Sequence, residues 1–216
     1  MKTNFIIVRH GESLGNSKRI MLGSTDLDMS PRGFEQALAC AEFLAGEEVD
    51  YIYSSDLIRA YNTALPHAKL RGKEVVADER LREMHVGRWE NRPFAEIAAE
   101  EPELYREWRE KFGTLVFPGG ESILDAGKRF HNALLDIANR HPGKTVLVAS
   151  HAGVIRSFWG QLLGILPEKI GQELPFPINA SVSRLSFEDG VFTPLEYSTH
   201  HYLSEIGALV PGSIGK

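Results

Sequence analysis

Hydrophobic residues near the start of the chain predict a strand, a loop and a helix in that order. Residues 5–8 form a short continuous apolar run, which is typical of a strand buried on both faces, and Arg9-His10-Gly11 follows as a loop. Ser30-Pro31 has the form of a helix N-cap followed by a proline at the first helical position. Apolar residues then recur at helical spacing from Phe34 to Ala45.

The same unit recurs along the chain. Residues 51–53, 74–77 and 145–149 are further predicted strands. The pair Ser54-Ser55 is a predicted cap for a helix through residues 57–68, and residues 154–163 are a predicted helix after a loop at 150–153. Because strands and helices alternate, we expect an α/β fold, a three-layer sandwich whose mostly parallel sheet is flanked by helices.

Two segments depart from this alternation. Residues 182–187 and 191–197 flank Asp189-Gly190, a strong signal for a two-residue turn, and we expect a C-terminal hairpin at the sheet edge. Residues 88–115 read as helical pieces rich in Trp, Glu and Arg, broken by prolines and without a clear strand. We therefore predict a single domain over residues 1–216, with a small helical cap insertion at about 88–117.

Composition limits the class of protein. The chain has 216 residues, 43% of them hydrophobic and 25% charged, which is typical of one soluble globular domain. A net charge of -5 disfavours nucleic acid as a partner. The single cysteine, Cys40, has no internal disulfide partner, and we find neither a signal-peptide pattern nor an apolar run long enough for a membrane. We expect a cytoplasmic protein with no membrane partner, and its oligomeric state is unknown from the sequence.

Charged side chains gather where the predicted strands end. In parallel sheets, ligands bind beyond the carboxyl ends of the strands. The first strand ends at Arg9 and His10, the second leads to Arg59 in the first turn of its helix, the third precedes Glu83, and the fourth ends before His151. We expect these side chains to form a cationic pocket with one acid.

This set of side chains suits a phosphate ester. Guanidinium groups match phosphate oxygens in pairs, and a helix N-terminus adds N–H donors to the same anion. A neutral imidazole can accept a phosphoryl group while nearby cations stabilise its oxygens. A carboxylic acid beside the leaving oxygen can act as general acid, and Glu83 is the candidate for that role.

Five segments resemble those of the histidine phosphatase, or phosphoglycerate-mutase-like, superfamily, and they occur in the family's order over most of the chain. They are Arg9-His10-Gly11-Glu12-Ser13 with Asn16, Ser54-Ser55-Asp56-Leu57-Ile58-Arg59-Ala60 with Thr63-Ala64, residues 81–90, Pro118-Gly119-Gly120-Glu121-Ser122, and residues 150–156.

The resemblance implies a three-layer α/β fold, no metal and no cofactor. It implies that His10 is the nucleophile and Glu83 the proton donor, and that the phosphoryl group is bound by Arg9, Asn16, Arg59 and His151. We add Gly23 and Ala152 as predicted substrate-binding positions. Ala152 and Asn91 depart from the family, which often has glycine at both places.

Other residues leave alternatives open. Glu90 and Glu121 are alternative acids to Glu83, and His85 is placed to line the substrate pocket. The remaining histidines lack metal-ligand spacing, so we expect packed or solvated roles for His67, His131, His141, His200 and His201. Asp26-Leu27-Asp28 superficially resembles the paired aspartates of metal-dependent phosphatases, but no strand precedes it and a turn is the better interpretation.

Gly11-Glu12-Ser13-Leu14-Gly15 also satisfies the nucleophile-elbow pattern of α/β-hydrolases, with Ser13 as nucleophile. That fold needs earlier strands and an upstream oxyanion loop, and only one predicted strand precedes Ser13. It also gives no reason for Arg9 and Arg59 in the site.

We therefore predict a metal-independent phosphomonoester hydrolase that acts through a phosphohistidine on a small phosphorylated metabolite. The alternative is a cofactor-dependent phosphoglycerate mutase, and a remote one is a non-catalytic module that binds a phospho-ligand. Mutases resemble one another in a long basic cap, whereas residues 88–111 carry five basic and seven acidic residues. The natural substrate stays open among sugar phosphates, nucleotide-like phosphates such as ribazole phosphate, and small glycolytic acids.

Overall fold

A mixed sheet forms the centre of the computed structural model, which describes residues 1–204; the end of the predicted domain, residues 205–216, lies outside the described residues. The sheet has six strands in the order β4-β3-β6-β1-β7-β8. Strands β4, β3, β6 and β1 run parallel, and β7 and β8 are antiparallel. Their bounds are β1 Thr3–Arg9, β3 Tyr51–Ser54, β4 Val75–Ala77, β6 Thr145–Ser150, β7 Val182–Glu188 and β8 Val191–Thr199.

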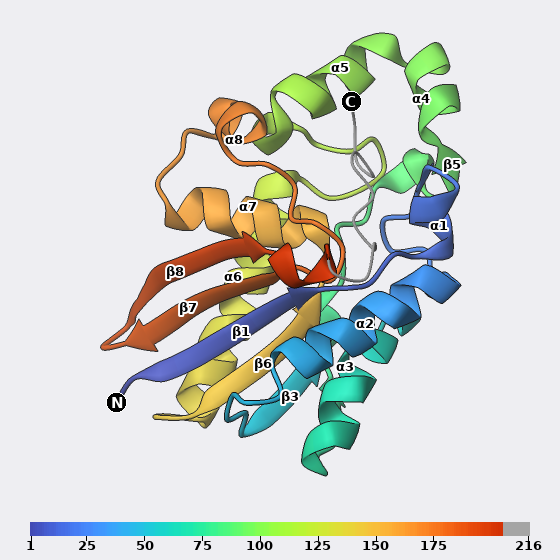
Figure 1. Ribbon diagram of the computed structural model, residues 1–216. Helices are drawn as coiled ribbons and strands as arrows, with labels where there is room; N and C mark the ends of the chain where they lie inside the picture. The colour runs from blue at the N-terminus through green and yellow to red at the C-terminus, as the bar shows by residue number, and fades with distance from the viewer. Residues whose placement is uncertain (205–216) are drawn as a thin grey trace.

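Helices cover both faces of the sheet (Figure 1). Helices α2 (Pro31–Phe43) and α3 (Ile58–Arg71) lie on one face, and α6 (Ile123–Arg140) and α7 (Ala152–Leu162) lie on the other. Alternate residues of β1 belong to different cores: Phe5 and Ile7 pack with the α6 and α7 side, and Ile6 and Val8 with the α2 and α3 side. This confirms the three-layer fold and explains why residues 5–8 are all apolar.

Most predicted helix boundaries agree with the structure, and Ser30 caps α2 by accepting the N–H of Gly33 at 3.1 Å. The predicted cap at Ser54-Ser55 was wrong, because α3 begins at Ile58 after an N-cap at Leu57. The N–H of Ile58 donates to the Asp26 carboxylate at 2.7 Å, so a distant loop caps this helix. Helix α6 was not predicted, although Ile123, Ala126, Phe130, Ala133, Leu134 and Ile137 are buried at helical spacing.

The C-terminal hairpin is confirmed. Strand β7 pairs with β1, and β8 pairs with β7 at the edge of the sheet. The turn residues Asp189 and Gly190 have φ of 51° and 84°. Two positive φ values in succession are what a type I′ hairpin turn requires, and Asp-Gly adopts them readily.

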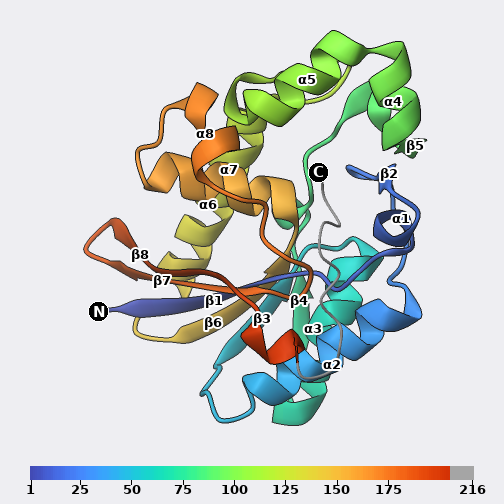
Figure 2. The ribbon, with the colours of Figure 1, turned by 45° about the horizontal axis from the view of Figure 1, so that its top comes forward.

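Residues 88–117, which we call the cap, lie beyond the carboxyl ends of the parallel strands (Figures 1 and 2). The cap contains β5 (Arg92–Pro93), α4 (Phe94–Glu100), α5 (Pro102–Glu110) and the 3₁₀ turn η3 (Phe112–Thr114), and α8 (Pro167–Glu173) packs beside it. The prediction of a cap without a strand was wrong, since β5 pairs with β2 (Ile20–Met21). Asn91, just before β5, has φ of 56°, a left-handed conformation that asparagine tolerates better than most residues other than glycine.

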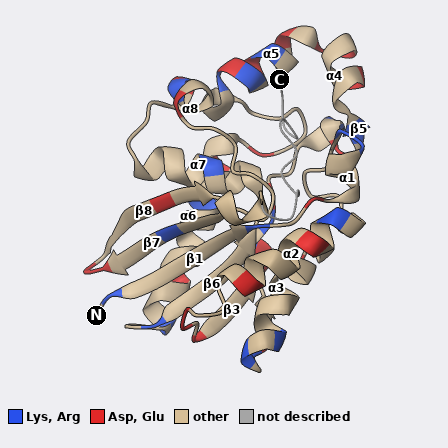
Figure 3. Ribbon diagram, viewed as in Figure 1, with Lys and Arg blue, Asp and Glu red and all other residues tan. Residues whose placement is uncertain are grey.

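The shorter elements complete the described chain. They are α1 (Leu14–Ser17) and the 3₁₀ turns η1 (Glu79–Leu81), η2 (Gly87–Trp89) and η4 (His201–Leu203). Acidic and basic residues alternate along α5, as Figure 3 shows. Within residues 1–204, none of the helices has both the length and the apolar character needed to cross a bilayer.

Candidate active site

The predicted site residues gather at the carboxyl end of the sheet. Arg9 is the last residue of β1, and the N–H of His10 donates to the Ser150 carbonyl at 2.9 Å, which ties the ends of β1 and β6 together. Beneath the cap, a cavity opens at this edge. Its polar wall consists of Arg9, His10, Ser13, Asn16, Arg59 and Glu83.

The imidazole of His10 is held in one orientation. Its Nδ1 lies 2.6 Å from the carbonyl oxygen of Gly11, so Nδ1 carries the proton and Nε2 keeps its lone pair. The N–H of Gly11 in turn donates to the Thr63 hydroxyl at 3.0 Å. Burial, followed by the charges of Arg59 and Arg9, holds the pKa of His10 well below 6.5, and the ring is therefore neutral at pH 7.

His151 lies directly behind His10. The two ring centroids are 5.1 Å apart, with the rings inclined by 58°. His151 is fully buried and does not line the cavity itself. Burial also lowers its pKa well below 6.5, and neither ring nitrogen has a hydrogen-bond partner among residues 1–204. Buried polar atoms usually have a partner, and an anion beside His10 would supply one.

Two buried guanidinium groups flank His10. Arg59 donates to the carbonyls of Thr25 and Gly23, both at 2.7 Å, and Arg9 donates to the carbonyl of Pro177 at 2.5 Å. The Nε of Arg9 is buried without a partner in the described chain. Burial lowers the pKa of each arginine to about 10, so both stay charged at neutral pH. The site thus offers two cations to an anion beside a neutral imidazole.

Among the three candidate acids, only Glu83 lies in the cavity. Its carboxylate accepts the N–H groups of Gly153 and Val154 at the start of α7, at 3.0 and 3.1 Å. The Glu90 carboxylate accepts hydrogen bonds from loop N–H groups, and the Glu121 carboxylate forms an ion pair with Arg129.

At the start of α7, most backbone N–H groups already have partners within the protein. In the first turn of α7, Gly153 and Val154 donate to Glu83, and Ile155 donates to the His151 carbonyl at 3.2 Å. Within the described chain, the N–H of Ala152 is therefore the one donor of that turn that these contacts leave for a ligand.

The predicted binding residues Asn16, Gly23 and Ala152 also line the cavity. The side-chain oxygen Oδ1 of Asn16 accepts the backbone N–H of Ser13 and a side-chain N–H of Asn179, each at 3.1 Å. Gly23 has φ of 52°, and a Cβ there would lie 2.2 Å from the Glu90 carboxylate, so a larger residue would displace this loop. His85 is exposed and does not line the cavity.

The competing interpretations of Ser13 and of the paired aspartates do not fit their surroundings. The Ser13 hydroxyl caps α1 by accepting the N–H of Asn16 at 3.0 Å. Asp26 caps α3, and Asp28 accepts from the Asn62 side chain at 2.8 Å. In the described chain, residues 1–204, we find no group of three or more His, Cys, Asp or Glu side chains that could hold a metal ion.

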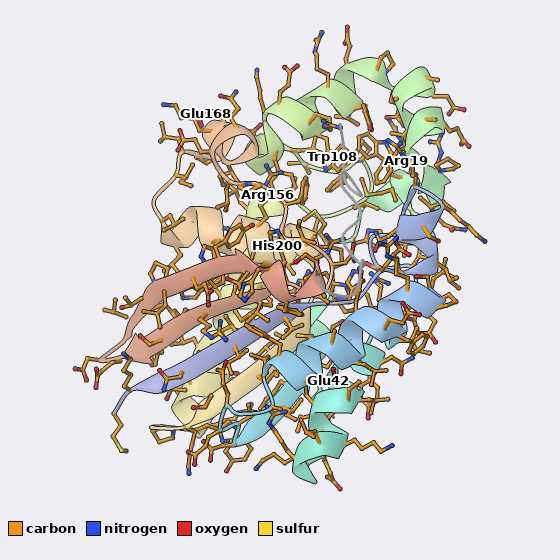
Figure 4. All side chains as sticks on the ribbon, viewed as in Figure 1. Arg19, Glu42, Trp108, Arg156, Glu168 and His200 are labelled. Carbon is orange, nitrogen blue, oxygen red and sulfur yellow. The ribbon has the colours of Figure 1, made fainter. Side chains whose placement is uncertain are left out.

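The opposite wall of the cavity was missed from the sequence. It is apolar and consists of Ile20, Met21, Leu22, Met84, Val86, Phe94, Trp108, Phe112, Phe117 and Phe176. In Figure 4, Trp108 lies below α5 on the side that faces the body of the protein, with Arg156 nearby. The Trp and Phe residues of the cap were a signal in the sequence, but their spacing does not show which of them face the site.

Comparison with known proteins agrees with this arrangement. The model of the histidine phosphatase superfamily (branch 1) matches residues 5–199. A metal-independent phosphoserine phosphatase of Arabidopsis thaliana is 36% identical over 216 residues, covering 99% of this chain and 88% of that protein. A probable phosphoglycerate mutase, GpmB, of Yersinia pestis is 34% identical over 187 residues, covering 85% of this chain and 84% of that protein.

Among solved structures, a mycobacterial glucosyl-3-phosphoglycerate phosphatase in complex with VO3 superposes with a TM-score of 0.85 at 31% identity, covering 91% of this chain and 99% of that one. The family match over residues 5–199 takes in the sheet, the helices on both of its faces and the cap. The chain belongs to the histidine phosphatase superfamily, branch 1.

Proposed function

We propose that this protein is a metal-independent phosphatase that hydrolyses phosphomonoesters of small metabolites through a phosphohistidine at His10. One observation carries the proposal. The neutral imidazole of His10, whose Nδ1 is hydrogen-bonded to a backbone carbonyl, lines the cavity together with the two buried guanidinium groups of Arg9 and Arg59. Relatives named as phosphatases support hydrolysis.

In the first step, Nε2 of His10 attacks phosphorus and the bond from phosphorus to the ester oxygen breaks. Arg9 and Arg59 stabilise the negative charge on the phosphoryl oxygens. Asn16 and His151 donate further hydrogen bonds to these phosphoryl oxygens. Glu83 donates a proton to the departing oxygen, so the product leaves as a neutral alcohol.

In the second step, water attacks phosphorus of the phosphohistidine. The Glu83 carboxylate accepts a proton from that water, the bond from phosphorus to Nε2 breaks, and inorganic phosphate leaves. The cycle thus returns His10 to its neutral form and gives back to Glu83 the proton that it donated in the first step. Because the two arginines supply the positive charge, no metal enters either step.

The cap supports hydrolysis over mutase activity. A mutase must hold a second phosphate and a carboxylate while phosphohistidine persists. The charged residues that line the cavity, among those the structure describes, are Arg9, Arg59 and Glu83, and all three have roles at the reacting phosphoryl group. We also propose a cytoplasmic location, where a free thiol such as that of the buried Cys40 would stay reduced.

An assay for released phosphate with p-nitrophenyl phosphate and metabolite phosphomonoesters in EDTA tests this function. We expect turnover in wild type and none in His10→Ala. Brief reaction with a ³²P-labelled ester should label wild type at His10. Efficient interconversion of 2- and 3-phosphoglycerate with negligible hydrolysis would instead identify a mutase, and phosphate binding without turnover would identify a binding module.

A further inference from the structure

The cavity has two chemically different halves. The half formed by β1, α3 and the segment at Glu83 is polar and charged, as the reaction at phosphorus requires. The half formed by the cap and its neighbours is lined by five aromatic side chains: Phe94 and Phe176 are half-buried at the cavity, and Trp108, Phe112 and Phe117 are buried directly around them. Resting on the function proposed above, we infer that this enzyme prefers phosphomonoesters of apolar or aromatic alcohols over those of amino acids or sugars.

The aromatic wall is already assembled by contacts among its own members. Phe94 stacks on Trp108, with ring centroids 5.6 Å apart and planes inclined by 14°. Phe112 and Phe176 meet edge to face at 5.1 Å. Ligand sites of this kind, apolar and largely preformed, bind the apolar part of a ligand without a cost of rearrangement.

Arg156 packs against this wall and does not line the cavity. Its guanidinium carbon lies 4.6 Å from the ring centre of Phe112 and 4.0 Å from that of Phe176. Its Nε donates to the Leu174 carbonyl at 2.6 Å, and Nη2 donates to the Gly171 carbonyl at 2.8 Å. Arg156 therefore supports the wall from behind instead of binding a substrate carboxylate.

The apolar character of the wall determines which alcohol groups bind well beside it. The carboxylate and ammonium groups of an amino acid would lose water against aromatic rings, and buried charges without partners are strongly disfavoured. A methylene group buried in the same place gains ~0.8 kcal/mol, which corresponds to about fourfold in binding. Affinity in the transition state should therefore increase with the apolar length of the alcohol.

A series of phosphate esters of primary alcohols tests this inference, because the same kind of bond breaks in each. We would measure kcat/KM for ethyl, butyl, hexyl and 2-phenylethyl phosphate, and for O-phosphoserine and glycerol 3-phosphate. We expect an increase of about fourfold per methylene from ethyl to butyl phosphate. Phosphoserine and glycerol phosphate should fall at least about tenfold below butyl phosphate.

Two outcomes are distinguishable. Hydrolysis of all the esters, with phosphoserine or glycerol phosphate preferred or with no dependence on chain length, would overturn this inference and leave the phosphatase function standing. No hydrolysis of any ester would overturn the proposed function and the inference with it.

Variants of Phe94, which is half-buried at the cavity, locate the effect. Phe94→Ser should lower the ratio of kcat/KM for hexyl over ethyl phosphate by about tenfold, and Phe94→Leu should largely restore it. Leu166→Ser is the matched control, because Leu166 is 54% exposed and lies outside the cavity. An unchanged ratio in folded Phe94→Ser would contradict the inference.

Discussion

Glu90 accepts two hydrogen bonds from Thr25, from its backbone N–H at 2.8 Å and from its hydroxyl at 2.6 Å. The other carboxylate oxygen accepts the N–H groups of Ser24 and Val86, at 2.9 and 3.0 Å. The loop that Glu90 holds presents the carbonyls of Gly23 and Thr25 to Arg59. Glu90 is thus a positioning residue for a guanidinium group that it does not contact.

We expect Glu90→Gln to lower kcat/KM by about tenfold, because an amide nitrogen would face N–H donors and shift the loop. The inhibition constant for inorganic phosphate should rise in parallel, which a loss of overall stability alone would not cause. Glu96→Gln, on the outer side of the cap, is the control. Wild-type phosphate affinity in Glu90→Gln would contradict the role.

Glu83→Gln tests the proton donor. Loss of a general acid slows departure of an alkoxide far more than departure of nitrophenolate, which needs little protonation. We expect the rate constant for phosphoryl transfer to His10 to fall by about 10² or more with alkyl phosphates, and much less with p-nitrophenyl phosphate. Pre-steady-state bursts separate the two steps. An equal loss for both substrates would argue against proton donation by Glu83.

Arg156→Met should destabilise the fold by about 2–4 kcal/mol, since it leaves carbonyls of Gly171 and Leu174 without a buried donor. Arg156 is 3% exposed and burial lowers its pKa to about 10, so it stays charged at neutral pH. Urea denaturation measures the change. Arg140→Met, at an exposed ion pair on α6, should cost at most about 0.5 kcal/mol, and equal stability of the two variants would contradict the prediction.

Gly33→Ala should destabilise the protein and reduce activity together. A Cβ at Gly33 would lie 2.0 Å from the carbonyl oxygen of Glu12, so the turn after His10 must move. We expect a loss of about 2 kcal/mol or more in thermal or urea unfolding. Gly46→Ala is the matched control, since nothing lies within 4 Å of its added Cβ. Similar behaviour of the two variants would show that the contact is relieved elsewhere.

His67 should make the protein less stable in acid. Burial lowers its pKa from 6.5 to about 3, so between these values the unfolded chain binds a proton that the folded chain does not. The contribution of the neutral, buried His67 to the free energy of unfolding is complete above pH 6.5. It is lost as the pH falls toward 3, by up to ~1.4 kcal/mol per pH unit. Urea unfolding of His67→Leu should show a smaller loss between pH 6.5 and 5, while exposed His85→Leu should follow wild type.

The local sequence determined the elements that follow a simple pattern of apolar or turn residues. Residues 5–8 are apolar without alternation because helices cover both faces of β1, and Asp189-Gly190 specifies a turn through φ alone. The candidate site was predictable for the same reason: parallel strands end at one edge, so Arg9, His10 and His151 had to meet there. The missed helix α6 also had a local pattern.

Tertiary structure decided what depends on partners far apart in the chain. The start of α3 is set by Asp26, which no cap rule applied to Ser54-Ser55 could find. Glu83, Glu90 and Glu121 carry the same side chain, so the sequence does not show which one is the acid. In the fold, they differ in the N–H groups and the arginine that their carboxylates contact. The aromatic wall brings residues 94 to 176 to one cavity, because packing, which is not periodic in sequence, selects which apolar side chains face the substrate.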